Sequence, residues 1–251
     1  MKLFERHQIA PCSEKICTLS ISFLMAVVRL IAHTPNPERV VAVASRLCYS
    51  KFDAEEILKT MTDEDVEKNI RLLNEMKHES PIEHASFTYS VTGISRACMA
   101  QFTRHRIAAF SVKSQRYVNE KKFKYVCPPG LEDDELYKKI MKNLHKAYQQ
   151  LKKKGYQNED ARFVLPNACD TQLIVTMNAR SLRNFFTLRC CHRAQWEIRD
   201  VANQMLKEAK KVAPIIFENA GPNCFRGPCP EGKLGETCPF RNKKGKKNNK
   251  K

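Results

Sequence analysis

The stretch at residues 101–117 reads QFTRHRIAAFSVKSQRY and holds four cations among hydroxyl and amide side chains. A guanidinium stays charged at any working pH, and its rigid fork of donors matches two phosphate oxygens at once. Serine and glutamine complete such a shell without adding charge. The stretch therefore predicts an anion site, and phosphate is the anion that its donors fit. The cations and donors are Gln101, Arg104, His105, Arg106, Ser111, Lys113, Ser114 and Arg116.

Apolar residues flank the basic groups, with Met99 and Phe102 before them and residues 107–110 after them. This bracketing favours a partly buried scaffold from which the basic side chains project. The alternative interpretation is a solvated basic strip, since basic clusters often bind nucleic acid. The formal net charge of +17 suits both anionic small molecules and nucleic acid. A basic nucleic-acid-binding protein therefore stays open as the second hypothesis.

The chain of 251 residues can bury the core of one domain, since a domain usually holds roughly 100 to 200 residues. We expect that domain over residues 25–220. Residues 1–24 are interpreted as an N-terminal extension that is dispensable or not the native start. The apolar segment at 16–31 contains Ser and Thr and falls short of the roughly 20 apolar residues of a membrane-spanning helix. Residues 221–251 are expected to be a flexible tail, rich first in Cys, Gly and Pro and then in Lys.

Periodicity and helix-start signals predict an α+β fold: a small, mostly antiparallel sheet with several helices packed around it. Asn36-Pro37-Glu38 supplies an N-cap, a proline at the first helical position and an acid in the first turn. Thr62, followed by three acidic residues, is a second start signal. Residues 87–94 alternate between apolar and polar, as is typical of a half-buried strand. The expected strands are 27–33, 87–94 and 173–177, and the expected helices are 36–49, 62–77, 95 onward, 132–154, 181–189 and 196–211.

The triplet Arg104-His105-Arg106, followed after seven residues by Ser114, matches an RHR-x7-S signature. In this signature the chain resembles the flavin-dependent thymidylate synthases. The resemblance extends in order, and with plausible spacing, over about residues 26 to 230, and it implies the α+β fold of that family. Further matching segments lie at residues 30–38, 46–49, 78–84, 178–181, 184–185 and 195–199.

The resemblance implies a chemistry as well as a fold. It implies methylation of dUMP to dTMP, with methylenetetrahydrofolate as the carbon donor, NADPH as the reductant and FAD as the hydride carrier. No side chain can store a hydride, so a cofactor must carry it while the protein supplies binding, orientation and electrostatics. A homotetramer with active sites at subunit interfaces is also implied, without a membrane or nucleic-acid partner.

Residue roles follow from the resemblance position by position. His78, expected near the flavin, and Arg199 are the expected catalytic residues. Ser114 is assigned to nucleotide binding, because the motif offers no base and acid that would activate it as a nucleophile. Many family members carry an acidic residue in place of Val112 and an arginine in place of Gln172, so this chain departs from them there. The expected FAD ligands are Ser80, Arg104, His105, Arg106, Arg189 and His192, and the expected dUMP ligands are Gln101, Ser111, Ser114, Arg116 and Arg199.

Eleven cysteines are scattered through apolar segments and do not form the framework of a small disulfide-rich domain. This pattern indicates a reduced, cytoplasmic chain. Cys224, Cys229 and Cys238 offer three thiolates of a zinc site, but the sequence shows no fourth ligand at a suitable spacing. We therefore expect no metal site.

Overall fold

The computed structural model describes residues 26–121, 124–235 and 238–239. The proposed N-terminal extension, residues 1–24, lies outside the described residues, as does the Lys-rich end of the chain from residue 240 onward. In the described part of the chain, no helix combines the length and the apolar character needed to cross a bilayer.

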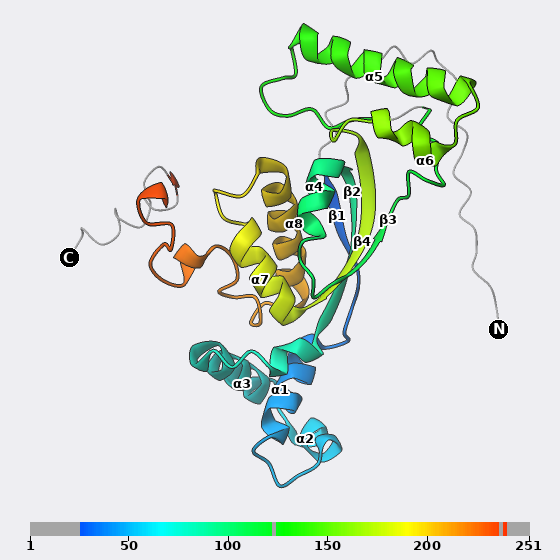
Figure 1. The fold of residues 1–251 in the computed structure, drawn as a ribbon. Coiled ribbons are helices and arrows are strands. Elements are labelled where there is room, and N and C mark those ends of the chain that lie inside the picture. Colours follow the sequence, from blue (N-terminus) through cyan, green and yellow to red (C-terminus); the bar gives the residue numbers. More distant parts are fainter. Residues whose placement is uncertain (1–25, 122–123, 236–237, 240–251) are drawn as a thin grey trace, which may run out of the picture.

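Four antiparallel strands form one sheet in the order β1-β2-β4-β3 (Figure 1). The central strands are β2, Ser86–Ser95, and β4, Asp170–Asn178. The edges are β1, Val27–His33, and β3, Ala109–Val112. The three predicted strands and the α+β fold class are confirmed. The additional strand β3 lies inside the basic stretch, so its pairing with β4 fixes where that stretch leaves the sheet.

A bulge in β2 leads into the first helix beside the sheet. Gly93 lies where the register of β2 against β4 shifts, and its φ of 71° is in the left-handed region that favours glycine. Ser95 then caps α4, Arg96–Phe102, because its hydroxyl accepts a hydrogen bond from the Cys98 N–H at 3.0 Å. The helix predicted from residue 95 onward is thus confirmed.

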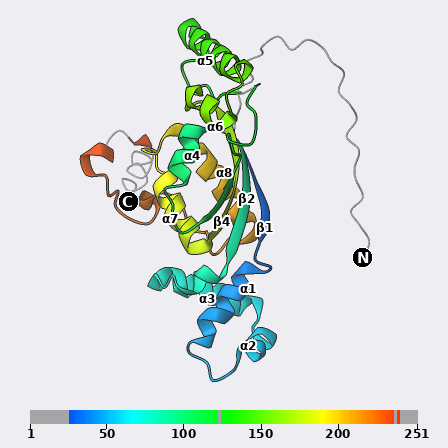
Figure 2. The ribbon, with the colours of Figure 1, turned by 45° about the vertical axis from the view of Figure 1, so that its right-hand side comes forward.

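The helices α4, α7 and α8 lie on one face of the sheet (Figures 1 and 2). α7, Ala179–Arg189, follows β4 directly, and α8, Trp196–Val212, contacts β1 and β2. One continuous cluster of buried apolar side chains fills the space between the sheet and these helices. Its phenylalanines are Phe87, Phe102, Phe185, Phe186 and Phe217.

The other helices extend the molecule beyond the two ends of the sheet (Figure 1). Three of them pack together near the start of the chain, and the others lie at the opposite end. The first group is α1, Pro37–Leu47, α2, Ala54–Thr60, and α3, Asp63–Met76; the second is α5, Glu135–Lys153, and α6, Asn158–Ala161.

The two predicted helix-start residues differ in whether their side chains make a capping hydrogen bond. Thr62 caps α3 as expected: its hydroxyl accepts from the Asp65 N–H at 3.1 Å, and its own N–H donates to the Asp65 carboxylate at 3.1 Å. Asn36 precedes α1 as expected, but its backbone is left-handed, with φ 44°, and its side chain makes no cap hydrogen bond. Glu38 in the first turn of α1 instead accepts from the Ile215 N–H at 2.6 Å.

The second face of the sheet is not covered by any helix of the described residues (Figures 1 and 2). Val27, Ile31 and Ile174 are large apolar residues of its strands with exposed fractions of 47%, 52% and 44%. Polar residues separate Val27 from Ile174 on this face, because Thr92 pairs with Val27 and Gln172, and Ser90 pairs with Arg29 and Ile174.

α5 also leaves apolar side chains uncovered. The sequence predicts an amphipathic helix with Leu136 and Ile140 on its apolar face, but these residues are 67% and 44% exposed. The residues that α5 buries are Met141 and Tyr148. Within the described residues, the helix contacts α6, the 3-10 turn Arg162–Val164 and parts of the segment 119–126, and these contacts leave part of its apolar face exposed.

Glu197 connects the start of α8 to the end of β2. Its buried carboxylate accepts hydrogen bonds from the Ser95 N–H at 2.6 Å and from the Ser95 hydroxyl at 2.5 Å. Burial raises the pKa of Glu197, and the two hydrogen bonds from Ser95 oppose that shift. Since Ser95 also caps α4, this pair holds α4 and α8 side by side.

Replacement of Glu197 by alanine is expected to lower the free energy of unfolding by about 1–3 kcal/mol, because the buried Ser95 N–H loses its acceptor. Glu197→Gln keeps one carbonyl acceptor and is expected to lose less. Urea unfolding followed by circular dichroism measures both changes. Equal unfolding midpoints for Glu197→Ala and the unaltered chain would show that the pair contributes nothing.

Candidate active site

The Arg104-His105-Arg106 turn is positioned by aromatic packing. Phe102, the last residue of α4, is fully buried and stacks on Phe185 of α7, with 5.0 Å between ring centroids. The His105 ring meets Phe185 edge-on at 4.9 Å. These contacts fix the turn against α7 while Arg104 and Arg106 stay exposed. Phe102 provides the partly buried scaffold predicted before the basic groups, whereas Ile107, directly after them, is 75% exposed.

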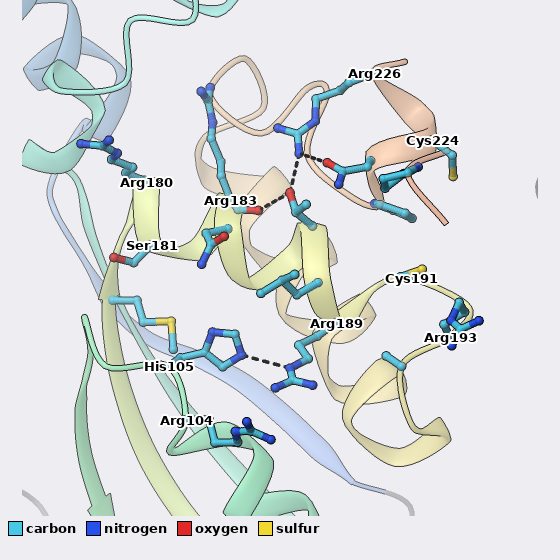
Figure 3. Close-up of a pocket in the computed structure, with 18 of the residues that line it drawn as sticks. Arg104, His105, Arg180, Ser181, Arg183, Arg189, Cys191, Arg193, Cys224 and Arg226 are labelled. Carbon is cyan, nitrogen blue, oxygen red and sulfur yellow. Dashed lines mark hydrogen bonds between the residues drawn. The ribbon is translucent and has the colours of Figure 1, made fainter. Parts of the chain in front are cut away.

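His105 is uncharged at neutral pH. Arg189, in the last turn of α7, donates from Nε to His105 Nε2 at 3.0 Å (Figure 3). Nε2 is therefore the acceptor, and the ring proton is on Nδ1. The pKa of His105 is lowered to about 4, first by burial and then by the charges of Arg189 and Arg104. The turn thus combines charged guanidinium groups with a neutral imidazole.

A pH titration of His105 by NMR is expected to give a midpoint of about 4 in the ligand-free chain. Because the folded pKa lies below the ordinary value of 6.5, unfolding takes up a proton between pH 6.5 and 4. The stability that His105 contributes is therefore fully present above pH 6.5 and is lost as the pH falls through this window. Arg189→Gln should raise the titration midpoint of His105, because it removes one positive charge. A midpoint near 6.5 in the unaltered chain would contradict the described environment of His105.

A cavity of about 1260 Å³ opens beside this turn. Its walls are residues 104–107, one side of α7, the loop between α7 and α8, and part of the segment after Ala220 (Figure 3). Positively charged and imidazole side chains make up much of the lining. They are Arg104, His105, Arg106, Arg180, Arg183, Arg189, His192, Arg193 and Arg226.

Carboxylates neutralise part of this charge. Arg180 pairs with Glu83 at 2.6 Å, and Arg193 pairs with Glu231 at 3.0 Å. Arg183 is held structurally, because its Nε donates to the backbone carbonyl of Ile216 at 3.1 Å. These arginines therefore already have partners within the fold.

Three arginines at or beside the turn have no carboxylate partner in the described part of the chain, although Arg189 donates hydrogen bonds to His105 and to the Gln101 carbonyl. Within the described residues no carboxylate forms an ion pair with Arg104, Arg106 or Arg189. The pKa of Arg189 is lowered, first by burial and then by the charge of Arg104. Two guanidinium groups thus repel each other, and an anion between them would relieve that repulsion. The arrangement suits a phosphate or pyrophosphate group.

The family model of the thymidylate synthase complementing proteins matches residues 29–215. The chain belongs to this family. It is 48% identical to the flavin-dependent thymidylate synthase of Clostridium tetani, over an alignment that covers 82% of this chain and 91% of the relative. It is 48% identical to the protein of the same name from Geobacter sulfurreducens, over 84% of this chain and 93% of that relative. It is 41% identical to the one from Pyrococcus furiosus, over 84% of this chain and 91% of that relative. The resemblance to flavin-dependent thymidylate synthases is confirmed.

In this member of the flavin-dependent thymidylate synthase family, the expected cofactor ligands line the cavity with the exception of Ser80. Ser80 and His78 lie in the turn between α3 and the short helix Pro81–His84, and both are exposed. Their neighbours Glu79 and Glu83 line the cavity instead. The role of His78 in catalysis and that of Ser80 in cofactor binding remain predictions.

Two of the expected nucleotide ligands lie where α4 and α8 approach each other. Gln101 donates to the Gln195 side chain at 3.5 Å, and Arg189 donates to the backbone carbonyl of Gln101 at 3.4 Å. Arg199, in the first turn of α8, donates to the His192 carbonyl at 2.5 Å. Gln101 and Arg199 are thus linked to the cavity through Arg189 and His192.

The other expected nucleotide ligands lie elsewhere in the chain. Ser111 is exposed on β3 opposite Ile174, on the uncovered face of the sheet. Ser114 accepts a hydrogen bond from the Arg116 N–H at 3.2 Å, and Arg116 forms an ion pair with Glu159 of α6 at 2.7 Å. Within one chain, Ser111, Ser114 and Arg116 do not line the cavity of the arginines.

Lys113 is already neutralised. The sequence places it among the cations of the anion site, but its Nζ forms an ion pair with Glu120 at 2.8 Å, and Glu120 is only 3% exposed. A buried carboxylate needs such a partner, so this lysine serves the fold.

Sequence reasoning missed the polar side of α7. Arg180, Arg183, Asn184 and Thr187 line the cavity. Their spacing of three, four and seven residues from Arg180 places them on one face of the helix, opposite its buried face. The sequence signal was a row of polar residues at helical spacing. This row indicates a cavity wall only when the structure shows that the arginine turn packs beside it.

Proposed function

We propose that the chain is a flavin-dependent thymidylate synthase that methylates dUMP to dTMP. In this proposal FAD is the flavin, methylenetetrahydrofolate is the carbon donor and NADPH is the reductant. Its support is the family membership together with one observation: Arg104, Arg106 and Arg189 line the cavity and have no carboxylate partner among the described residues. We place the reaction in a single catalytic domain over residues 25–220 of a cytoplasmic enzyme.

The residues of the cavity fit the pyrophosphate of FAD. The sequence contains neither GxGxxG nor GxxxxGK[ST], so arginines must supply the donors that a glycine-rich phosphate loop supplies elsewhere. Arg104, Arg106 and Arg189 would hold the phosphates, and His105 would orient Arg189 by accepting its Nε–H. When bound, FAD would carry the hydride, which no side chain can do.

Gln101 and Arg199 are proposed to bind dUMP at the ends of α4 and α8. Positive charge and N–H donors beside a uracil carbonyl would stabilise the enolate-like charge that develops as the new carbon bond forms. His78 is the second proposed catalytic residue. The protein would thus bind and orient the reactants and stabilise the charge that develops on the uracil.

A homotetramer with sites completed across subunits is part of the proposal. Ser80, Ser111, Ser114 and Arg116 do not line the cavity within one chain. The uncovered sheet face and the apolar face of α5 are surfaces that a second copy would bury. Static light scattering is expected to give the mass of four chains, and a stable, active monomer would contradict this part of the account.

The activity is tested by product formation. The purified chain, supplied with dUMP, methylenetetrahydrofolate, NADPH and FAD, is expected to form dTMP, which liquid chromatography resolves from dUMP. Omission of dUMP, methylenetetrahydrofolate or NADPH, or complete removal of the flavin, should abolish the product. Turnover that persists after complete removal of flavin would contradict the proposal.

No observation on the described residues favours the nucleic-acid-binding alternative. The cations of the basic stretch do not form one exposed strip: Arg104 and Arg106 line the cavity, while Lys113 and Arg116 are paired with carboxylates. The family membership points away from it as well.

A further inference from the structure

Lys113 is the residue at which the basic stretch leaves the sheet, and its polar groups are all held. Its N–H donates to the Gln172 carbonyl of β4 at 3.0 Å. Its carbonyl accepts a hydrogen bond from the Arg96 guanidinium at 3.0 Å. Its Nζ lies 2.8 Å from one oxygen of the Glu120 carboxylate and donates to the other at 3.0 Å. Lys113 therefore joins β4, the start of α4 and Glu120 at one point.

Glu120 is the more deeply buried member of the ion pair. It is only 3% exposed, and its N–H donates to the hydroxyl of Tyr148 at 3.1 Å. Tyr148 is itself fully buried on α5. Breaking a buried ion pair is strongly destabilising, because it leaves an uncompensated charge away from water. Glu120 thus fixes the Lys113 side chain from a position that α5 holds.

Two expected nucleotide ligands, Ser114 and Arg116, follow Lys113 in one turn of the chain. The Ser114 carbonyl accepts from the Val118 N–H at 3.0 Å, and the Ser114 hydroxyl accepts from the Arg116 N–H at 3.2 Å. These bonds close a turn that begins at the residue next to Lys113. A shift of the Lys113 backbone would therefore move both ligands together.

A second ion pair involves this turn, but it is exposed. Arg116 pairs with Glu159 of α6 at 2.7 Å, and the two side chains are 57% and 47% exposed. The side chains of Lys113 and Glu120 are 22% and 4% exposed. Water and salt screen an exposed pair, so it contributes little, whereas a buried pair cannot be broken without a large loss. The buried pair is therefore the contact that sets the position of the turn.

We propose that Lys113 and Glu120 are positioning residues for the nucleotide site. Their buried ion pair places Ser114 and Arg116, and neither member of the pair contacts the nucleotide. The inference rests on the proposed function, because that function assigns dUMP to these two ligands. It departs from the interpretation of Lys113 as a cation of the anion site, since the Lys113 ammonium group is directed to a buried carboxylate.

The inference predicts an effect on the nucleotide and not on the flavin. Neither Lys113 nor Glu120 lines the arginine cavity that is proposed to hold FAD. Loss of the ion pair should therefore weaken the binding of dUMP while the affinity for FAD changes little. A general loosening of the fold would instead lower both affinities, and that result would contradict a positioning role.

Three variants separate a positioning pair from a direct phosphate ligand. Lys113→Met and Glu120→Gln each break the ion pair, and the double variant removes both charges. Isothermal titration calorimetry on the FAD-loaded chains is expected to show dUMP binding about tenfold weaker in each single variant, a loss that corresponds to one hydrogen bond to a charged group. The double variant should recover part of this loss, because it leaves no buried charge unpaired.

The opposite pattern would show that Lys113 binds phosphate directly. Glu120→Gln would then bind dUMP as tightly as the unaltered chain or more tightly, because the ammonium group is released. The double variant would bind dUMP no better than Lys113→Met. Either result would overturn the proposal.

Hydrogen exchange followed by mass spectrometry tests the turn without any nucleotide. The amides of residues 114–118 are expected to exchange faster in both single variants than in the unaltered chain, and to exchange more slowly again in the double variant. Unchanged exchange would overturn the inference even in a chain that binds dUMP. Exchange that responds as expected in a chain that binds no dUMP would refute the proposed function, and with it the role of the pair in nucleotide binding.

Two further variants complete the test. Lys138→Met is the matched control, because Lys138 pairs with the exposed Glu135 on α5 and should leave the exchange and both affinities unchanged. Tyr148→Phe removes only the hydroxyl that accepts from the Glu120 N–H, so it disturbs the pair mildly if circular dichroism shows that a single variant has not folded. It should speed the exchange of residues 114–118 and weaken dUMP binding, and no change in either would contradict the proposal.

Discussion

Phe185→Ala is expected to lower the free energy of unfolding by about 3–5 kcal/mol, the range for removal of a large buried aromatic side chain. Phe185 is fully buried and lies 5.0 Å from the Phe102 ring and 4.9 Å from the His105 ring. Its loss would open a cavity at the point where the arginine turn rests on α7. Phe185→Ala should therefore weaken FAD binding as well as the fold.

Urea unfolding at a fixed chain concentration measures the loss in stability, and flavin fluorescence titration measures the effect on binding. Phe185→Leu retains part of the volume and should give a smaller loss. Leu72→Ala is the control, because Leu72 is 51% exposed on α3 and does not line the cavity. If Phe185→Ala and Leu72→Ala shifted the urea midpoint equally, the turn would not depend on this packing.

Arg189→Gln is expected to weaken FAD binding by roughly 10- to 100-fold, since a hydrogen bond to a charged group contributes about 1.5–3 kcal/mol. Arg189 is the proposed phosphate ligand that also contacts His105, and it has no carboxylate partner among the described residues. Arg189→Lys keeps the charge but loses the planar fork of donors, so its affinity should be intermediate.

Arg180→Gln is the matched control on the same helix. Arg180 lines the same cavity, but its guanidinium is paired with Glu83 at 2.6 Å. Loss of an exposed, paired arginine changes energies by about 0–1 kcal/mol, so FAD affinity should fall by less than about fivefold. Isothermal titration calorimetry at fixed salt compares the two variants. An Arg189→Gln chain that binds FAD as tightly as the unaltered chain would contradict the assignment of the phosphate site.

Local signals were enough to predict most helices and strands. Thr62 and its acidic neighbours mark the start of α3 because their hydrogen bonds are made within one turn. α2 was missed although Asp53 caps it, accepting from the Glu56 N–H at 2.8 Å. This helix has only seven residues and buries only Ile57, so its sequence shows no apolar period. β3 was missed because its pairing with the distant β4 creates it.

Only the part of the candidate site whose residues are neighbours in sequence could be predicted. The basic motif identifies Arg104 and Arg106 directly, because the residues are adjacent in sequence. The sequence cannot show that Lys113 meets a buried glutamate, or that Ser111 lies on the uncovered face of the sheet. These facts depend on strand register and helix packing, which arise from contacts between remote segments.

The central claim is that the arginine cavity holds a flavin that takes part in the synthase reaction, and absorbance spectroscopy tests it most directly. The purified chain is mixed with FAD, desalted and then treated with NADPH in the absence of oxygen, with and without dUMP. We predict that flavin bands remain in about one-to-one amount with the chain, and that NADPH bleaches them faster when dUMP is present. Absence of retained flavin from a folded chain under all of these conditions would contradict the account.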